Sequence, residues 1–535
     1  MAFNSGAPNI NFQVTNLSQN VPTASTSIGA MVLASNKGSV TAPGLVTSVP
    51  TLLAAYVNGN PPPNDLGLQA AIGFLQQGNQ LYIQRVVNGA LYGGIEIKKG
   101  GSPYVEAPFA SGSANPATWN FGPDGIFTIY AVNPGAWDNT ISVSVNSINT
   151  SNNTFVIQVF QDTNLGLQQL QETWTVSRQK QTDGYGNQQY LMTAINGYSN
   201  YIMVLDNPAE VSTEYPKPTV SVISTYFASG SDGSTVTDAQ VVTAWQNFAN
   251  QNTISVNVLM SAGQTGIATL NAIANIAEER GDSFALLDMP LAVTALSTAA
   301  QVAWVANTLN LNSTYAAIYS PWITVFDQYN GQNTYIAPSG DVGAVVALTD
   351  RTYKGAFGAP CLFNRGIINR AIGISNATTY DDGDLNTLSD GNINPIINDS
   401  GFGVVVYDEL TLAAIESDLS FIHVQRLINQ IQTASIPVAR SYLGEPLLPR
   451  TYMNITVEFG AYLATLQGLG AFDDNLDNGW ELICNNTNNS ATDRDNDTIN
   501  IWMFIRPVQV ARQIQINAII TRSSANFQTI IAAGI

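Results

Sequence analysis

The segment over residues 315–366 limits the possible fold most strongly. Residues 315–319 form a short apolar run without a polar face, which predicts a strand that is covered on both sides. Pro321 interrupts this run, because a proline donates no backbone hydrogen bond and restricts the residue before it. Residues 323–326 then resume the strand pattern. We therefore expect an α/β core with a buried strand at this point of the chain.

A turn and a helix are expected after this strand. Asn330 and Gly331 both tolerate positive φ, so they predict the turn. Ser339 is a candidate N-cap, because a serine hydroxyl can accept a backbone N–H of the first helical turn. Gly343 and the alanines that follow it would allow the helix to lie close against a sheet. We expect this helix to end before Lys354.

Residues 216–405 alternate between helical and strand patterns. Helices are expected over residues 238–249, 266–280 and 299–309, and strands over residues 254–260 and 284–288. Alternation of this kind predicts a mostly parallel sheet that is covered by helices. Residues 381–403 are rich in Gly, Asp and Asn, which predicts a loop that leads into the next unit.

Two other regions have a different character. Residues 89–215 contain short alternating runs between turn-forming residues, which predicts an inserted all-β sandwich. Leu412, Ile415 and Leu419 begin an apolar spacing that continues to Ile431 and predicts one long amphipathic helix. A second helix is expected over residues 455–469, and strands over residues 480–484 and 499–504.

These patterns divide the chain into six predicted segments. They are an N-terminal extended arm (1–25), the first part of an α/β core (26–88), the inserted β-sandwich (89–215), the rest of the core (216–405), an α+β domain (406–504) and a C-terminal extended arm (505–535). Each arm shows strand-like alternation. A strand outside a compact domain has an unsatisfied backbone, so it needs a sheet edge from its own or another subunit.

The composition excludes several classes of partner. The chain has 535 residues, of which 11% are charged, and its formal net charge is −19. Phosphate binding needs clustered Lys and Arg, and no such cluster is present, so we expect neither nucleic acid nor an anionic membrane as a partner. Cys361 and Cys484 form no redox or metal motif, which indicates a reducing compartment. No secretory signal and no apolar run of membrane-spanning length is present, so no membrane insertion is expected.

The sequence motifs predict no catalytic, cofactor or metal site. His423 is the only histidine, and it lies beside apolar positions of a predicted helix, which favours a structural role. The chain has no Gly-x-Ser-x-Gly elbow, P-loop or Gly-x-Gly-x-x-Gly fingerprint. The acidic run that begins at Asp493 starts like a calcium loop. However, Thr498 stands where that loop requires Gly, and Phe504 where it requires Glu.

A family resemblance rests on landmarks in a fixed order. They are Tyr-Ser-Pro-Trp at 319–322, Pro-Ser-Gly at 338–340, Thr-Asp at 349–350, Gly355, and a run from Ala-Pro to Arg-Gly at 359–366. In this order they resemble the central signature of contractile tail sheath proteins, from myophage tails and other contractile injection systems. The helix around residues 423–427 is also similar, although Gln425 replaces an arginine of the family pattern.

The resemblance implies a structural protein and not an enzyme. The core would have a subtilisin-like topology without a protease site. The subunit would polymerise as stacked hexameric rings around an inner tail tube protein, with baseplate and tail terminator proteins as further partners. It would be assembled in the host cytoplasm and belong to the phage virion. Contraction of the sheath would drive the tube through the host envelope for DNA ejection.

The resemblance also implies two sets of contact residues. Neighbouring subunits would exchange terminal strands, for which the alternating residues are Ile10, Phe12, Val14, Val508, Val510, Ile514 and Ile516. The α+β domain would lie innermost, facing the tube. If the tube is acidic, the candidates for contacting it are Arg426, Arg440 and Arg450.

Three alternative functions stay open from the sequence. One is a hydrolase on the α/β core, which would need a pocket with a nucleophile and a base. Another is the sheath of a contractile injection system that is not a phage. The third is a capsid or adhesin component, which is favoured only if the β insertion binds glycans.

Overall fold

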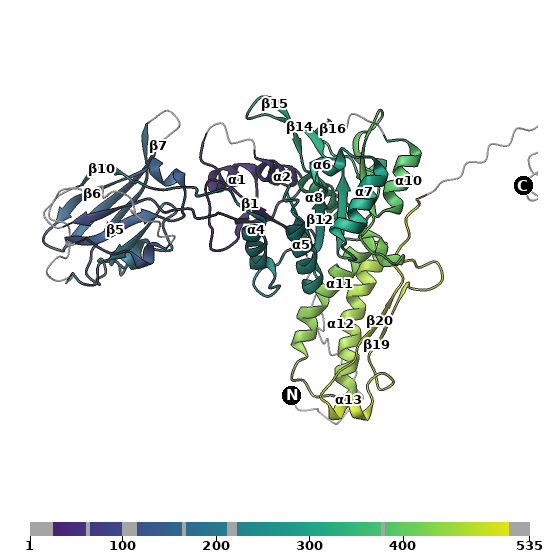
Figure 1. Ribbon diagram of the computed structural model, residues 1–535. Coiled ribbons are helices and arrows are strands. Elements are labelled where there is room, and N and C mark those ends of the chain that lie inside the picture. The colour runs from purple at the N-terminus through teal and green to yellow at the C-terminus, as the bar shows by residue number, and fades with distance from the viewer. Residues whose placement is uncertain are drawn as a thin grey trace, which may run out of the picture.

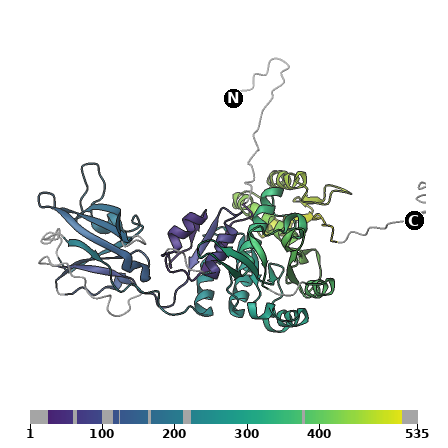
Figure 2. The same cartoon turned by 90° about the horizontal axis from the view of Figure 1, so that it is seen from above.

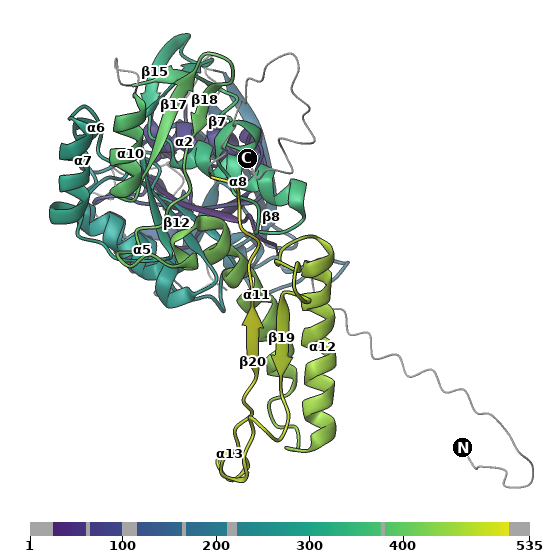
Figure 3. The ribbon, with the colours of Figure 1, turned by 90° about the vertical axis from the view of Figure 1, so that its right-hand side faces the viewer.

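The computed structural model describes residues 25–59, 65–98, 115–122, 124–162, 167–210, 222–375 and 380–512. These residues form three bodies (Figure 1). A central α/β body has a β body beside it, next to α1 (Val49–Tyr56) and α4 (Asp238–Trp245), and Figure 2 shows the same arrangement from above. A C-terminal unit, residues 422–505, projects from the central body (Figure 3).

An eight-stranded mixed sheet forms the centre of the molecule. Its order is β18-β17-β13-β12-β11-β1-β3-β2. The parallel strands are β1 (Gly29–Leu33), β3 (Leu81–Arg85), β11 (Val258–Met260), β12 (Phe284–Asp288), β13 (Ala316–Ser320) and β17 (Ile393–Asp399). The edge strands β2 (Gly44–Val46) and β18 (Gly403–Val406) are antiparallel to their neighbours. The predicted mixed α/β fold with a mostly parallel sheet is thus confirmed.

Helices cover both faces of this sheet, because its strands are apolar on both sides. Along β1, Met31 and Leu33 enter one hydrophobic cluster, while Ala30 and Val32 enter the other. The first face is covered by α2 (Leu66–Phe74) and α8 (Ser339–Tyr353). The second is covered by α4, α5 (Ile267–Arg280) and α7 (Thr298–Trp304), which continues as a π-helical turn over Val305–Leu309.

The start of α8 differs from the prediction. Pro338 is the N-cap, and Ser339 is the first helical residue. The Ser339 hydroxyl donates to Asp288 Oδ2 at 2.7 Å, so this serine ties the helix to the end of β12 instead of capping it. The expected close packing is confirmed, since Gly343 faces Met260 of β11. The helix ends where Lys354 takes a left-handed conformation with φ 57°.

Two predictions at the end of the core are wrong. The segment 381–403, which was expected to be a loop, contains α10 (Asp382–Asp390) and the hairpin strand β17. Helix α10 forms because Asp381 caps it by accepting the N–H of Asp384 at 2.8 Å. The helix expected from Leu412 begins only at residue 422. Leu412 lies in the core, Ile415 is 81% exposed, and a 3₁₀ turn (Asp418–Ser420) precedes the helix.

The β body contains two small sheets around one hydrophobic cluster. One sheet consists of β10 (Val222–Tyr226), β6 (Ile141–Asn149), β7 (Thr154–Asp162) and β8 (Gln168–Val176). The other consists of β4 (Gly94–Lys98), β5 (Gly125–Ala131) and β9 (Ile202–Asp206). Phe127 and Phe155, one from each sheet, stack with ring centroids 5.6 Å apart, so the two sheets share a core.

The C-terminal unit is a helix pair with a two-stranded sheet. Its helices are α11 (Ile422–Ser441) and α12 (Pro449–Gly468), and the sheet consists of β19 (Trp480–Ile483) and β20 (Trp502–Ile505). A three-stranded sheet of β14 (Ile323–Asp327), β15 (Gln332–Ile336) and β16 (Ala371–Ile374) lies on the central body. The turn predicted after β14 is confirmed by Gly331, whose φ is 66°. No helix in the described ranges has the length and apolarity that a membrane span requires.

Candidate functional site

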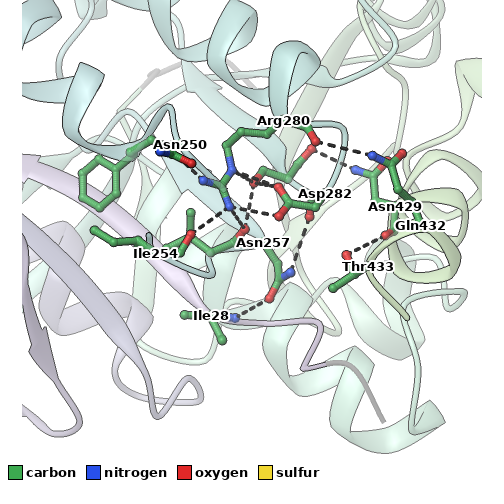
Figure 4. A network of polar contacts seen from close by, with 12 residues as sticks. Ile28, Asn250, Ile254, Asn257, Arg280, Asp282, Asn429, Gln432 and Thr433 are labelled. Carbon is green, nitrogen blue, oxygen red and sulfur yellow. Dashed lines mark hydrogen bonds and ion pairs between the residues drawn. The ribbon is translucent and has the colours of Figure 1, made fainter. Parts of the chain in front are cut away.

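The C-terminal unit meets the central body at a buried polar junction (Figure 4). Arg280 is the last residue of α5, and its guanidinium donates to the Asp282 carboxylate at 2.9 and 3.0 Å. It also donates to the carbonyl oxygen of Phe248 at 2.7 Å. Burial lowers the pKa of Arg280, and the Asp282 charge acts in the opposite direction. These bonds allow a buried charge to hold the end of α5 in one position.

Helix α11 and the beginning of β1 are attached to the same junction. Asn429 on α11 donates from Nδ2 to the carbonyl oxygen of Ser283 at 2.8 Å. Asn257 donates to the carbonyl oxygen of Asp282 and accepts the N–H of Ile28, both at 3.4 Å. The junction therefore joins three segments that are far apart in the sequence.

A buried ion pair connects α11 to α8. Arg426 donates to both carboxylate oxygens of Asp350, at 2.8 and 2.6 Å, and the two side chains are only 3% and 2% exposed. The same guanidinium donates to the carbonyl oxygen of Thr26 at 2.9 Å. This planar, bidentate geometry suits arginine and not lysine. Arg426 thus contacts the first described residues of the chain.

One turn earlier on α11, His423 is bound on both sides of its ring. Nδ1 lies 2.8 Å from Glu409 Oε1, and Nε2 lies 3.3 Å from the carbonyl oxygen of Val508. The backbone N–H of His423 also donates to Glu409 Oε2 at 3.3 Å, so this carboxylate caps the first turn of α11. Burial lowers the pKa of His423, but the hydrogen bond and charge of Glu409 outweigh burial, and the pKa is raised above 6.5.

The last described residues run back over their own chain. The N–H of Val508 donates to the carbonyl oxygen of Ala471 at 3.2 Å, and Val510 packs against the first core cluster. Arg512 donates to Asp408 Oδ2 at 2.6 Å. Residues 508 and 510 therefore contact their own subunit in this conformation. The other residues predicted to exchange strands lie outside the described residues, namely Ile10, Phe12, Val14, Ile514 and Ile516.

The three arginines predicted to face a tube lie in different environments. Arg426 belongs to the buried ion pair, so its side chain is not available at the surface in this conformation. Arg440 is exposed and donates to Asn252 Oδ1 at 2.7 Å. Arg450 is exposed in the first turn of α12. For Arg440 and Arg450 the contact with a tube stays a prediction.

The outer face of the β19–β20 sheet is apolar and exposed. Trp502 and Phe504 are 52% and 53% exposed, on the face that points away from the helix pair, while Met503 packs inward. Within the described part of the chain, neither strand of this sheet has a further strand partner. An exposed aromatic patch beside unpaired strand edges is typical of a surface that another chain covers.

The groups that a hydrolase would require are engaged in structural contacts. Ser339 donates to the buried Asp288, which also accepts the hydroxyl of Ser261 at 2.6 Å. Burial raises the pKa of the Cys361 thiol well above 9.0, which keeps it protonated and weakly nucleophilic. The imidazole of His423 is held by Glu409 and Val508. No group of three metal-ligating side chains occurs among the residues that the structure describes.

Comparisons with known proteins identify relatives of this chain. No family model matches it. The chain is 28% identical over 228 residues to the tail sheath protein of Vibrio phage KVP40, a match over 42% of this chain and 33% of that protein. It is 25% identical over 316 residues to the tail sheath protein of phage T4, over 56% of this chain and 47% of that protein. The chain therefore spans between a third and about half of the length of these relatives.

Solved structures agree with these relatives. The sheath tail protein of Listeria innocua has a TM-score of 0.59 at 11% identity, over 88% of this chain and 91% of that chain. The helical sheath of the anti-feeding prophage in its contracted state has a TM-score of 0.55 at 12% identity, over 97% of this chain and 99% of that chain. The chain is thus similar in sequence to phage tail sheath proteins and shares the fold of solved sheath proteins.

These comparisons confirm the resemblance to contractile tail sheath proteins. Sheath proteins are structural, so the comparisons favour a structural protein over a hydrolase. The mixed α/β fold of this chain, with one large sheet and several small ones, is that of the solved sheath structures.

Sequence reasoning missed the residues that hold the C-terminal unit of this chain. Glu409 and Asp350 carry no local signal for their roles, because their partners His423 and Arg426 lie in other elements. Trp502 and Phe504 could have been found, since two aromatic residues two positions apart share one face of a strand.

Proposed function

We propose that this chain is the structural subunit of a contractile phage tail sheath. Copies polymerise as stacked six-fold rings around an inner tail tube, and contraction drives the tube through the host envelope. The observation that carries this proposal is the sequence similarity to phage tail sheath proteins, together with a shared fold over almost the whole chain. Baseplate and tail terminator proteins are the further partners, and one structural relative comes from a baseplate.

The fold supports a mechanical role. Contraction needs no nucleotide site if it leads downhill from a metastable state that is held by a kinetic barrier. Compact bodies joined by polar junctions can move as units, while terminal strands keep the subunits connected. The edges of β19 and β20, which have no further strand partner among the described residues, are the sites where arms of neighbouring subunits would add as further strands.

Two finer statements belong to the same proposal. The core has the subtilisin-like topology that the family resemblance implies, which its run of parallel strands with helices on both faces supports. The division of the chain into a core, an inserted β body and a C-terminal unit is supported by a separate hydrophobic cluster in the β body and further clusters in the C-terminal unit. Two boundaries differ from the prediction: β10 extends the β body beyond residue 215, and Leu412 packs in the central body, so the C-terminal unit begins at residue 422.

The linking role of the C-terminal arm is tested by truncation. A chain that ends at Arg512 keeps every contact described above, and we expect it to remain a dispersed monomer in sedimentation and in negative-stain micrographs. A full-length chain with Ile514→Pro and Ile516→Pro should behave in the same way, because proline cannot donate to a β ladder. The matched control, with valine at both positions, should form tubes. Tubes formed by the truncated chain would show that this arm does not link subunits.

A second candidate is the sheath of a contractile injection system that is not a phage. The solved structures that favour it are the anti-feeding prophage sheath and an extracellular contractile injection system in its contracted state. An electron micrograph of the native particle distinguishes the two, because only a phage tail carries a capsid.

A further inference from the structure

The first two turns of α11 contact both ends of the described chain. Arg426 donates to the carbonyl oxygen of Thr26 at 2.9 Å, and His423 lies 3.3 Å from the carbonyl oxygen of Val508. Residues three apart lie on the same side of a helix. One helical face therefore holds the segment that begins at residue 25 and the segment that ends at residue 512.

The hydrogen-bond partners of His423 require a charged ring. The Glu409 carboxylate beside Nδ1 and the Val508 carbonyl oxygen beside Nε2 are both acceptors. A neutral imidazole has one N–H, so it can satisfy only one of them, whereas an imidazolium donates to both. Glu409, which is 2% exposed, supplies the negative charge that stabilises this imidazolium inside the protein.

Other charged and titratable groups surround this pair from each neighbouring element. They are Asp408 beside Glu409, Arg365 of α9 (Leu362–Arg365), Tyr319 of β13, Cys361, Arg426 of α11 and Arg512 of the C-terminal segment. Arg365 disfavours the charged ring. Arg426 is paired with Asp350, and Arg512 with Asp408, so neither competes for Glu409.

We propose that the first turns of α11 form a shared anchor for the segment at Thr26 and the segment at Val508, in which charged His423 holds the C-terminal segment and releases it on deprotonation. When the ring loses a proton, its lone pair faces the Val508 carbonyl oxygen, and the bond is lost. The Arg426 bond to Thr26 does not involve the imidazole ring, so the N-terminal segment stays in place. Deprotonation of His423 therefore releases the C-terminal segment and leaves the N-terminal segment bound.

The direction of the pH effect follows from the raised pKa of His423. Its ordinary value is 6.5, and the folded value is higher, so the bond is fully present below 6.5 and is lost as the pH rises through the folded value. Use of this switch to free an arm for exchange between subunits rests on the proposed function. The switch itself is a property of the single chain.

Hydrogen–deuterium exchange of the full-length, dispersed chain tests the switch. The probe is the peptide over residues 506–512, which contains the Val508 N–H bonded to Ala471 at 3.2 Å. After correction for intrinsic rates, we expect exchange of this peptide to accelerate by about tenfold or more between about pH 6 and about pH 9, because a hydrogen bond from a charged donor is lost. A peptide over residues 25–33 is the internal control and should show no such step.

Two variants distinguish the role of Nε2 from that of Nδ1. The amide of His423→Gln places a donor near the Nε2 position without titrating, so the probe peptide should stay protected at both pH values. His423→Asn places its donor near Nδ1, so the peptide should exchange rapidly at both. Because His423 is the only histidine, neither variant retains a histidine that could produce the step.

Several outcomes would overturn the switch. They are a wild-type chain without the step, a step that persists in His423→Gln, or a 25–33 peptide that opens together with 506–512. Tube formation is scored separately by electron microscopy. A chain that shows the step but never forms tubes supports the switch and contradicts the proposed function, whereas tubes without the step contradict the switch alone.

Discussion

Replacing Arg426 by methionine should destabilise the attachment of α11 more than any exposed substitution on that helix. Arg426 donates to Asp350 at 2.8 and 2.6 Å and to Thr26 at 2.9 Å, and the two charged side chains are only 3% and 2% exposed. Methionine fills similar space but leaves the Asp350 carboxylate buried without its partner. Breaking a buried pair in this way costs about 3–5 kcal/mol.

The second half of this prediction is a double-mutant cycle. Asp350→Leu alone should cost a similar amount, because it leaves the arginine buried and unpaired. The double variant, Arg426→Met with Asp350→Leu, removes both charges. Its loss of stability should be much smaller than the sum of the losses of the two single variants. The coupling free energy between the two positions should therefore be about 3 kcal/mol.

The assay must report on α11 itself, since a chain with several cores does not unfold in one step. Native-state hydrogen exchange of peptides from α11 gives the free energy of local opening. Arg440→Met is the matched control, because Arg440 is exposed on the same helix and should change this free energy by less than about 0.5 kcal/mol. The reasoning would be refuted if Arg426→Met lowered the free energy of local opening no more than the control does. It would also be refuted if the losses of the two single variants simply added up in the double variant.

Three further predictions concern other parts of the molecule. Gly340→Ala should lower the free energy of unfolding by about 1–3 kcal/mol, measured by thermal or urea unfolding, because the new Cβ would lie 2.7 Å from the Cα of Ala70 in the backbone of α2. Gly343→Ala should lower it less, because its new Cβ would meet a movable methionine side chain. Burial raises the pKa of Asp138 from 3.8 to about 9, so between these values the folded chain keeps a proton that the unfolded chain releases. The stability of the β body should therefore fall by up to about 1.4 kcal/mol per pH unit, and urea unfolding at several pH values should show that Asp138→Asn removes this slope. Trp502→Ser should leave the circular dichroism spectrum unchanged but reduce tube formation in micrographs, and equal tube formation would show that the exposed face of β20 is not an interface.

Strong local patterns predicted the core elements well. The strands expected over residues 284–288 and 315–319 appear as β12 and β13, because a continuous apolar run between turn signals has few other solutions in an α/β chain. The helix expected over residues 266–280 appears as α5, which ends at Gly281 in a left-handed conformation.

The wrong predictions arose where composition and spacing misled. The Asp and Asn residues after 381 suggested a loop, yet Asp381 uses its carboxylate to start α10. Leu412 and Ile415 matched a helical spacing, but Leu412 packs into the core while Ile415 points to solvent. Apolar spacing alone cannot distinguish a helix from an irregular segment whose apolar side chains point in different directions.

The sequence by itself determined the resemblance to tail sheath proteins, the alternation of strands and helices, and the absence of a catalytic motif, because each depends on residues that are close together in the chain. Only the tertiary structure decided which groups hold the C-terminal unit. His423 meets Glu409 from 14 residues away and Val508 from 85, and Arg426 meets Asp350 from 76 residues away and Thr26 from 400. Contacts over such separations leave no periodic trace in a single sequence, since they depend on how the sheet, its helices and the segments at Thr26 and Val508 are packed together.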